Sequence, residues 1–170
     1  MLIVKWLIIA VLVLIVVAIA AGQLGFLQGT PPTDLGVRDG RLKPPSMTEN
    51  SVTSQAALYP DHPQRKYADI APLALKGDGP ATIARIKAIV EGMDGAKVVK
   101  SDPGYLYAQF TTKLMKYVDD VEFWFDPGAK VIQVRSASRV GRGDLGVNRK
   151  RVEAVRAALA TTSDGQAIPR

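Results

Sequence analysis

The chain of 170 residues contains no cysteine and only one histidine, His62. The lack of cysteine excludes disulfide bonds, thiol catalysis and metals held by cysteine, and it fits any cellular compartment. A single histidine excludes the multi-histidine sites that bind zinc. We therefore expect neither a metal nor another cofactor.

Signatures of the common enzyme classes are also lacking. The sequence has no nucleophile elbow, no phosphate-binding loop and no metal-ligand spacing. We therefore expect a binding role without catalysis, and a hydrolase is kept as an alternative below. Acidic residues are the minority, so the net charge is +6 and the pI is about 9.7. This balance suits nucleic acid, anionic lipid or another anionic ligand.

The first segment is the longest apolar run of the chain, unbroken from Trp6 to Ala21. As a helix, Leu2 to Ala21 would span about 30 Å, the thickness of a bilayer core. We predict a transmembrane helix in residues 1–22 and favour an uncleaved signal anchor. A secretory signal peptide cut after Ala18-Ile19-Ala20 stays open as the other interpretation.

Lys5 and the terminal amine predict a cytoplasmic N-terminus, because cations near a membrane span favour that side. The rest of the chain would then lie in the periplasm, tethered to the inner (cell) membrane. This location argues against nucleic acid as a partner. The expected partners are the membrane itself, an anionic small molecule or lipid headgroup, and a partner protein.

The remaining chain divides into three parts. Residues 23–66 are rich in glycine and proline, so neither helix nor strand is expected in what we predict to be a linker wrapping the domain. Residues 67–162 are predicted to form the domain, and residues 163–170 a disordered tail.

Periodic patterns in the domain predict strands at 69–75, 96–101, 105–111, 117–125 and 130–138, and helices at 81–93 and 148–160. The order is β-α-β-β-β-β-α. Four successive strands with short connections indicate an antiparallel sheet, and the two helices can cover one face of it. The expected fold is therefore a two-layer α+β domain.

Alternation along the strands sorts their residues onto two faces. Phe110, Val121 and Phe123 would face the helices. The other face would carry Tyr105, Tyr107, Gln109, Asp120, Glu122, Trp124, Gln133, Arg135 and Arg139. The Asp126-Pro127-Gly128 turn predicts a hairpin that places Asp120 opposite Arg135, Glu122 opposite Gln133 and Trp124 opposite Val131.

Three interpretations of this second face stay open. The first is a solvated face with ion pairs. The second is a binding face whose aromatic and arginine side chains bind a carboxylate or phosphate, with a pocket under the wrapped linker. The third is a hydrolase that uses Asp120 and Glu122 as paired carboxylates. Arg135 opposite Asp120 would hold that carboxylate ionised, which suits structure or a base rather than an acid.

Cations also gather where the last strand leads into the last helix, with seven Arg and Lys in residues 134–156. Asp144 and Asn148 are residue types that cap helix N-termini. Arg149, Lys150 and Arg151 fill the first turn, where the helix dipole is already positive. The carboxylates of Asp119, Asp120, Glu122 and Glu153 could balance them within the fold, or an external anion or lipid headgroup could do so.

The strings VDDVEFWF at 118–125 and VRSASRVGRGDLGVNRKRVE at 134–153 resemble the domain-of-unknown-function family fourteen-ninety-nine of bacteria and plants. LGVRDGRLKPP at 35–45 and VTSQAA at 52–57 are similar to its N-terminal block, so the resemblance covers about residues 30–160. The resemblance implies a membrane-tethered or exported protein. The family's usual two cysteines match Pro45 and Ser51 here, which excludes cysteine-dependent chemistry in this chain.

The family has no reaction to transfer, but the resemblance implies that the polar residues of these strings, Ser136 and Ser138 among them, form one constellation. No residue is assigned as catalytic beyond the alternative pair Asp120 and Glu122. The predicted ligand-binding residues are Arg135, Arg139, Arg149, Asp144, Asn148, Asp119, Asp120, Glu122, Tyr107 and Trp124.

Overall fold

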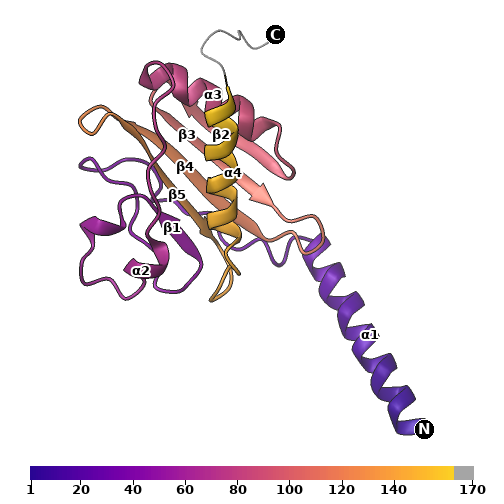
Figure 1. Ribbon diagram of the computed structural model, residues 1–170. Helices are drawn as coiled ribbons and strands as arrows, with labels where there is room; N and C mark the ends of the chain where they lie inside the picture. The colour runs from indigo at the N-terminus through magenta and orange to yellow at the C-terminus, as the bar shows by residue number, and fades with distance from the viewer. Residues whose placement is uncertain (163–170) are drawn as a thin grey trace.

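The computed structural model describes residues 1–162 of the chain, so the tail predicted at 163–170 lies outside the described residues. The elements, in chain order (Figure 1), are α1 (Leu2–Gln23), β1 (Ser51–Thr53), the 3-10 helix η1 (Ala56–Leu58), α2 (Arg65–Ala68), α3 (Gly79–Glu91), β2 (Ala96–Asp102), β3 (Tyr105–Thr111), β4 (Val118–Asp126), β5 (Val131–Ser138) and α4 (Val147–Thr161).

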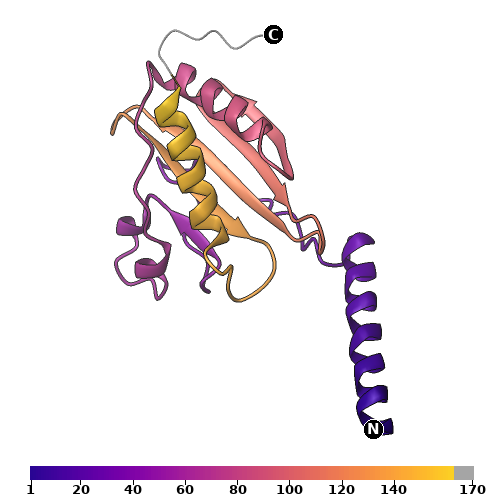
Figure 2. The same ribbon diagram turned by 45° about the vertical axis from the view of Figure 1, so that its right-hand side comes forward.

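The domain has two layers. Its five strands form one sheet of order β1-β5-β4-β3-β2, in which every neighbouring pair is antiparallel. Helices α3 and α4 lie side by side on one face of the sheet (Figures 1 and 2). The predicted α+β class, the antiparallel sheet and its cover of two helices are confirmed.

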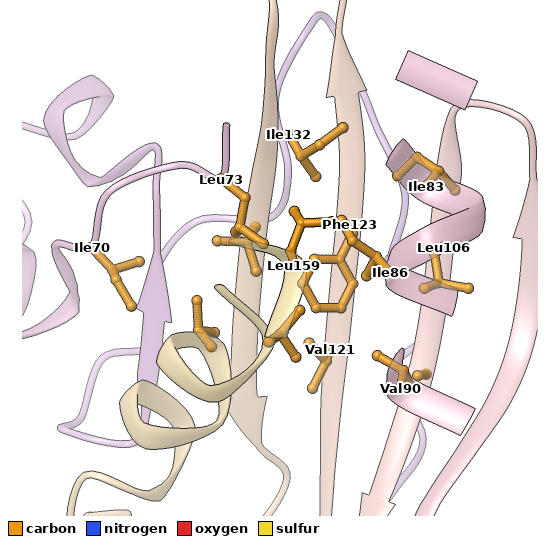
Figure 3. Packing of buried hydrophobic residues seen from close by; sticks show 14 of the residues in the cluster. Ile70, Leu73, Ile83, Ile86, Val90, Leu106, Val121, Phe123, Ile132 and Leu159 are labelled. Carbon is orange, nitrogen blue, oxygen red and sulfur yellow. The ribbon is translucent and has the colours of Figure 1, made fainter. Parts of the chain in front are cut away.

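The hydrophobic core lies between this sheet face and the two helices (Figure 3). Alternate residues of β4, Val121 and Phe123, point into it and are fully buried. Each such side chain stabilises the fold by about 1.5–3 kcal/mol relative to an exposed position. The helices supply residues at helical spacing: Ile83, Ile86 and Val90 from α3, and Val152, Val155 and Leu159 from α4.

The first strand is not the predicted one. Residues 69–75 form only isolated bridges, at Asp69 and Leu73. Pro72 cannot donate a backbone hydrogen bond, and its carbonyl and that of Ala71 accept hydrogen bonds of 2.6 Å from the Arg156 guanidinium. The strand that completes the sheet is β1, which pairs with β5. The expectation that residues 23–66 lack regular structure is therefore wrong at 51–53, at 56–58 and at 65–66, where α2 begins.

The predicted register of the β4–β5 hairpin is wrong by two residues. Asp126 pairs with Val131, so the loop between them has four residues rather than two. The Asp126 carboxylate accepts the N–H groups of Gly128 and Ala129, both at 3.0 Å, and Lys130 has a φ of 54°. As a result Arg135 lies opposite Glu122, not Asp120.

The second sheet face is covered by irregular chain. The wrapping segment, residues 30–47, crosses this face and is fixed to it by Gly36 N–H, which donates to Glu122 at 2.7 Å, and by the Pro44 carbonyl, which accepts from Arg135 at 3.3 Å. Asp120, Glu122 and Arg135 are 2%, 0% and 5% exposed. The interpretation as a solvated face is therefore wrong for these three residues, which lie under this segment.

Helix α1 projects away from the domain (Figures 1 and 2) and is long and apolar enough to cross a membrane. Its last residue is fixed to the β3–β4 loop: the Gln23 amide donates to the carbonyls of Leu114 at 2.8 Å and Lys113 at 3.3 Å. A Cβ at Gly22 would lie 2.6 Å from the Met115 carbonyl oxygen, so glycine permits this close approach.

Candidate functional site

Except for Arg149, the polar residues expected to form one constellation lie in two clusters on opposite faces of the sheet. The cleft cluster lies under the wrapping segment and contains Asp120, Glu122, Arg135, Arg139 and Tyr107. The helix-side cluster lies at the start of α4 and contains Asp119, Ser136, Ser138, Asp144, Asn148 and Arg151. Asp119 separates from Asp120 and Glu122 as alternation predicts.

In the cleft cluster, Asp120 is paired with Arg139. The guanidinium donates from Nε to Oδ2 at 2.8 Å and from Nη2 to Oδ1 at 2.7 Å, a bidentate geometry. Tyr107 OH donates to Oδ1 at 2.5 Å and accepts from the Gln109 amide at 2.8 Å. Burial raises the pKa of Tyr107, and the bond to Asp120 acts in the same direction. This part of the cluster is internally satisfied.

Glu122 is the least accessible carboxylate of the cleft cluster. Its Oε1 accepts from Gly36 N–H and from Tyr105 OH, both at 2.7 Å, whereas Oε2 has no hydrogen-bond partner in the described chain. Burial raises the pKa of Glu122, which outweighs these two bonds and the attraction of Arg135. The carboxyl therefore keeps its proton to a higher pH than an exposed glutamate.

Arg135 lies opposite Glu122 and is nearly as deeply buried. Within the described residues its guanidinium donates one hydrogen bond, from Nε to the Pro44 carbonyl, and it forms no ion pair with a carboxylate. Burial lowers the pKa of Arg135, against the attraction of Glu122, Asp120 and Asp34. A buried arginine normally has several acceptors, so the terminal nitrogens of Arg135 have unused donor capacity.

Arg135 lines a cleft of about 670 Å³ between the sheet and the wrapping segment. Two ion pairs also line it: Arg139 with Asp120, and Lys43 with Asp34 at 2.7 Å. The pocket expected under the wrapped linker is thus present as a cavity. The charges that line the cleft cancel in these two pairs, except for the charge of Arg135. The neighbouring Glu122 has a raised pKa, so its carboxyl offsets Arg135 only when it is ionised.

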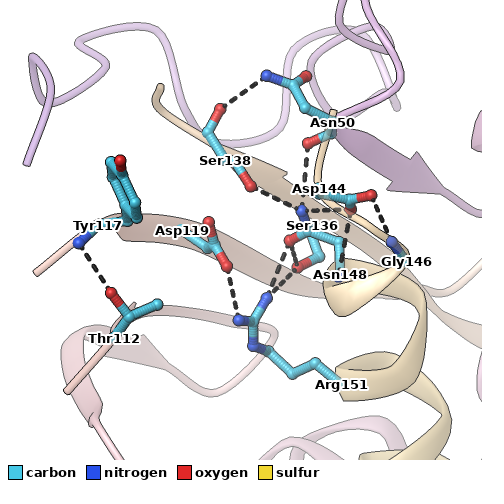
Figure 4. Close-up of polar contacts among 10 residues, drawn as sticks. All are labelled: Asn50, Thr112, Tyr117, Asp119, Ser136, Ser138, Asp144, Gly146, Asn148 and Arg151. Atoms are coloured by element: carbon cyan, nitrogen blue, oxygen red, sulfur yellow. Dashed lines mark hydrogen bonds and ion pairs between the residues drawn. The ribbon is translucent and has the colours of Figure 1, made fainter. Parts of the chain in front are cut away.

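The helix-side cluster is centred on Asn148, which is fully buried (Figure 4). Its side-chain amide donates to Asp144 at 2.7 Å and to Ser138 at 3.0 Å, and its carbonyl accepts from Ser136 at 2.5 Å. The amide also donates to the backbone carbonyl of Asn50, which precedes β1. Asn148 therefore joins α4, β5 and β1.

Arg151 completes this cluster and neutralises Asp119. Its Nη2 donates to Asp119 at 2.6 Å, and its Nη1 donates to Asn148 at 2.9 Å and Ser136 at 3.1 Å. The guanidinium also stacks on Phe110, 4.5 Å from the ring centre. Arg151 was not among the predicted ligand-binding residues, yet its position one turn after Asn148 places both on one helix face, which could have indicated the link.

Asp144 fixes the loop that leads into α4. It accepts from Tyr67 OH, from Gly146 N–H at 2.9 Å and from the backbone and side chain of Asn148. Burial acts to raise the pKa of Asp144, but these bonds outweigh it and lower the pKa. Burial and the bond to Asp144 raise the pKa of Tyr67 to about 12. The pair therefore holds its proton on tyrosine and its charge on aspartate.

Two predicted ligand-binding residues lie outside both the cleft cluster and the helix-side cluster. Arg149 donates to the carbonyls of Tyr67 at 2.6 Å and Asp69 at 2.8 Å. Trp124 lies on the cleft face between Tyr105 and Gln133, but does not line the cleft. Asp34 and Lys43 do line it and were missed, because irregular chain has no periodicity that would place them.

The chemistry of the two clusters differs. The helix-side polar groups bond mainly to one another, which suits a structural network. In the cleft, Asp120 is paired with Arg139 and Glu122 is fully buried, so the two carboxyl groups lack the accessible acid that a hydrolase of the expected kind needs. The described residues contain no group of three or more His, Cys, Asp or Glu that could hold a metal ion.

Comparison with curated proteins and with solved structures finds no match for this chain. A protein-family model does match, over residues 41–159. The match includes the whole sheet, α3, all but the last two residues of α4 and every residue of both clusters, and it starts after α1. It spans well over half of the chain, so the chain belongs to the family described as protein of unknown function (DUF1499).

Proposed function

We propose that this protein is a membrane-tethered binding domain whose cleft takes up a small anion without transforming it. In this proposal α1 is an uncleaved signal anchor of the inner (cell) membrane, the N-terminus is cytoplasmic and the domain is periplasmic. The apolar length of α1 and Lys5 near its start support that orientation.

The observation that carries the proposal is that Arg135 is buried but forms few hydrogen bonds. Its side chain is 5% exposed, yet the described residues accept only one hydrogen bond from it and none forms an ion pair with it. Its terminal nitrogens form no hydrogen bond with the described residues, yet they are not among the fully buried atoms that lack a partner, so they are open to the cleft. A ligand oxyanion in the cleft would supply acceptors for these nitrogens.

The charge of the cleft sets the class of ligand. Arg139 is balanced by Asp120 and Lys43 by Asp34, so the guanidinium of Arg135 is the excess charge when Glu122 is protonated. A planar guanidinium with two free terminal nitrogens matches a carboxylate or phosphate in bidentate geometry. We therefore infer a carboxylate or phosphate group as the recognised chemistry.

The test is a ligand titration of the full chain in detergent. Melting temperature is measured against phosphate, glycerol phosphate, citrate and short dicarboxylates. At one hundred times its dissociation constant a ligand stabilises the fold by about 2.7 kcal/mol. The variant Arg135→Met removes the charge and keeps an apolar stem, and Arg142→Gln, on an exposed loop residue, is the matched control.

The expected result is a shift that Arg142→Gln keeps and Arg135→Met loses. Without ligand, Arg135→Met should melt close to the parent, because the change removes only one hydrogen bond and a charge that burial already disfavours. Binding should also strengthen as pH falls through the raised pKa of Glu122, since the neutral carboxyl no longer offsets Arg135. An equal shift in both variants, or no shift across the panel, would refute the proposal.

A further inference from the structure

Exposed apolar side chains gather on two loops of the domain, the β3–β4 loop (112–117) and the β5–α4 loop (139–146), and at the first residue of α4. Leu145 is 94% exposed, and Leu114 is 57% exposed. Tyr117, Val140 and Val147 are exposed too. Outside α1 and the residues just after it, the other exposed large hydrophobic residues of the described chain are Met47, Leu58 and Val99.

Leu145 is unusual in its backbone as well as its exposure. Its φ is 51°, a left-handed conformation that L-residues other than glycine, asparagine and aspartate rarely adopt. The neighbouring bonds of Asp144 to Gly146 and Asn148 hold the loop in this shape. The fold thus presents a large apolar side chain to the outside at a conformational cost.

The two loops lie at the same end of the domain. In the antiparallel sheet the end of β3, the start of β4 and the end of β5 coincide, and α4 begins there. A hollow of about 310 Å³ between the loops is lined by Tyr117, Val140, Leu145 and Val147, among others. The loops therefore form one surface, which we name the apolar end.

Helix α1 is fixed to this end. Figures 1 and 2 show it leaving the domain beside the β3–β4 loop, and its last residue, Gln23, is bonded to the carbonyls of Lys113 and Leu114. With 22 residues, α1 is about 33 Å long, close to the thickness of a bilayer core. If Leu2 lies at one boundary of that core, Gln23 and the loop bonded to it lie at the other.

Cations surround the apolar side chains at this end. Lys113, Lys116 and Lys150 line a groove of about 890 Å³ beside the loops, together with Arg151, and the one carboxylate of that lining is Asp94. Arg142 is exposed on the β5–α4 loop itself. Apolar side chains rimmed by Lys and Arg match the boundary between acyl chains and anionic headgroups.

We propose that the apolar end rests on the anionic bilayer in which α1 is embedded, with Leu114 and Leu145 inserted among the headgroups and the lysines on their phosphates. This inference rests on the anchoring part of the proposed function and is independent of the cleft. The attachment of α1 to the same surface favours a bilayer over a protein partner, because it fixes the apolar end at the membrane boundary.

The absence of cysteine allows single-cysteine variants of the full chain to be labelled with the fluorophore NBD. The variants are Leu145→Cys and Leu114→Cys at the apolar end, Ala129→Cys in the β4–β5 turn at the opposite end of β4, and Val13→Cys within α1. Each is reconstituted in vesicles of phosphatidylcholine with phosphatidylglycerol. Quenching by aqueous iodide and by headgroup-proximal nitroxide lipid is then measured.

We expect labels at 145 and 114 to be quenched several times more by the nitroxide lipid than the label at 129, and several times less by iodide. The label at 129 also reports which fraction of the domains faces outward. Iodide access at 145 and 114 equal to that at 129 would overturn the inference. If the label at 13 stays shielded in that case, the anchor stands and only the contact surface fails; if 13 is also accessible, the anchor itself is refuted.

The contribution of the cations is tested with vesicles of phosphatidylcholine alone. Each lysine near an anionic leaflet strengthens the contact about fivefold, so the shielding at 145 should decrease when phosphatidylglycerol is omitted. Shielding that is unchanged by this omission would overturn the role assigned to Lys113, Lys116 and Lys150.

Discussion

Removing the charge of Arg151 should destabilise the domain strongly, although the residue lies on the sheet face opposite the cleft. Arg151 and Asp119 are 2.6 Å apart, with side chains 9% and 7% exposed. Arg151→Met keeps an apolar stem on the Phe110 ring but leaves Asp119 buried without its partner. Breaking one side of a buried pair typically costs about 3–5 kcal/mol, and the bonds to Asn148 and Ser136 are lost as well.

The double variant Asp119→Leu/Arg151→Met removes both charges. Replacing a buried ion pair with apolar residues of similar size is often close to neutral, so we expect the double variant to recover much of the loss. Glu153→Ala is the matched control on the same helix, because it breaks the exposed pair of Glu153 with Arg156. Exposed pairs contribute about 0–1 kcal/mol.

The assay is urea unfolding of the full chain in detergent, followed by the fluorescence of Trp124 on the sheet. Free energies of unfolding are compared among the parent, the single variants Asp119→Leu and Arg151→Met, the double variant and the control. A loss below about 1 kcal/mol in Arg151→Met, no larger than a surface pair gives, would refute the structural role of the pair. A double variant as unstable as the sum of its single changes would also refute it.

Three further outcomes follow from the contacts. Burial raises the pKa of Glu122 in the folded state above 4.5. The protonated carboxyl therefore contributes stability below pH 4.5, and this contribution is lost as pH rises through the folded-state pKa. Glu122→Gln should remove this pH dependence in urea titrations at acid and neutral pH. Gly79→Ala would place a Cβ 2.2 Å from the Phe125 ring and should cost about 1–3 kcal/mol in the same titration. Tyr67→Phe removes a hydrogen bond to the ionised Asp144 and should lower the free energy of unfolding by about 1.5–3 kcal/mol, measured by calorimetry.

The sheet and its faces could be predicted because they depend on alternation. Val121 and Phe123 had to share one face of β4, and Asp120 and Glu122 the other, whatever the register of the neighbouring strands. The helices were predictable for a similar reason, since Ile83, Ile86 and Val90 repeat at helical spacing.

The register of the hairpin and the cover of the second face could not be predicted in this way. The Asp-Pro-Gly string fits a short turn, whereas the left-handed Lys130 that lengthens the loop has no signal of its own. The wrapping segment lacks any period, because its contacts come from single backbone groups such as Gly36 N–H and the Pro44 carbonyl. Long-range contacts of this kind are invisible to a local pattern.

Pro45 and Ser51, which the resemblance aligns with two family cysteines, lie close together. Ser46, next to Pro45, donates its N–H to Ser51 Oγ at 2.8 Å, which ties the end of the wrapping segment to β1. A hydrogen bond thus connects chain segments that a disulfide could connect in members with both cysteines. In this chain the connection is insensitive to reductants, so dithiothreitol should leave its stability unchanged.

The order of these contacts along the chain has a consequence for synthesis. Gly36 is made 86 residues before Glu122, its partner. At roughly 5–20 residues per second, the segment waits about 4–17 s before its sheet exists. Proline and glycine give it little tendency to pair with other strands meanwhile. The proline and glycine content that prevented a prediction of its contacts thus protects the nascent chain from premature association.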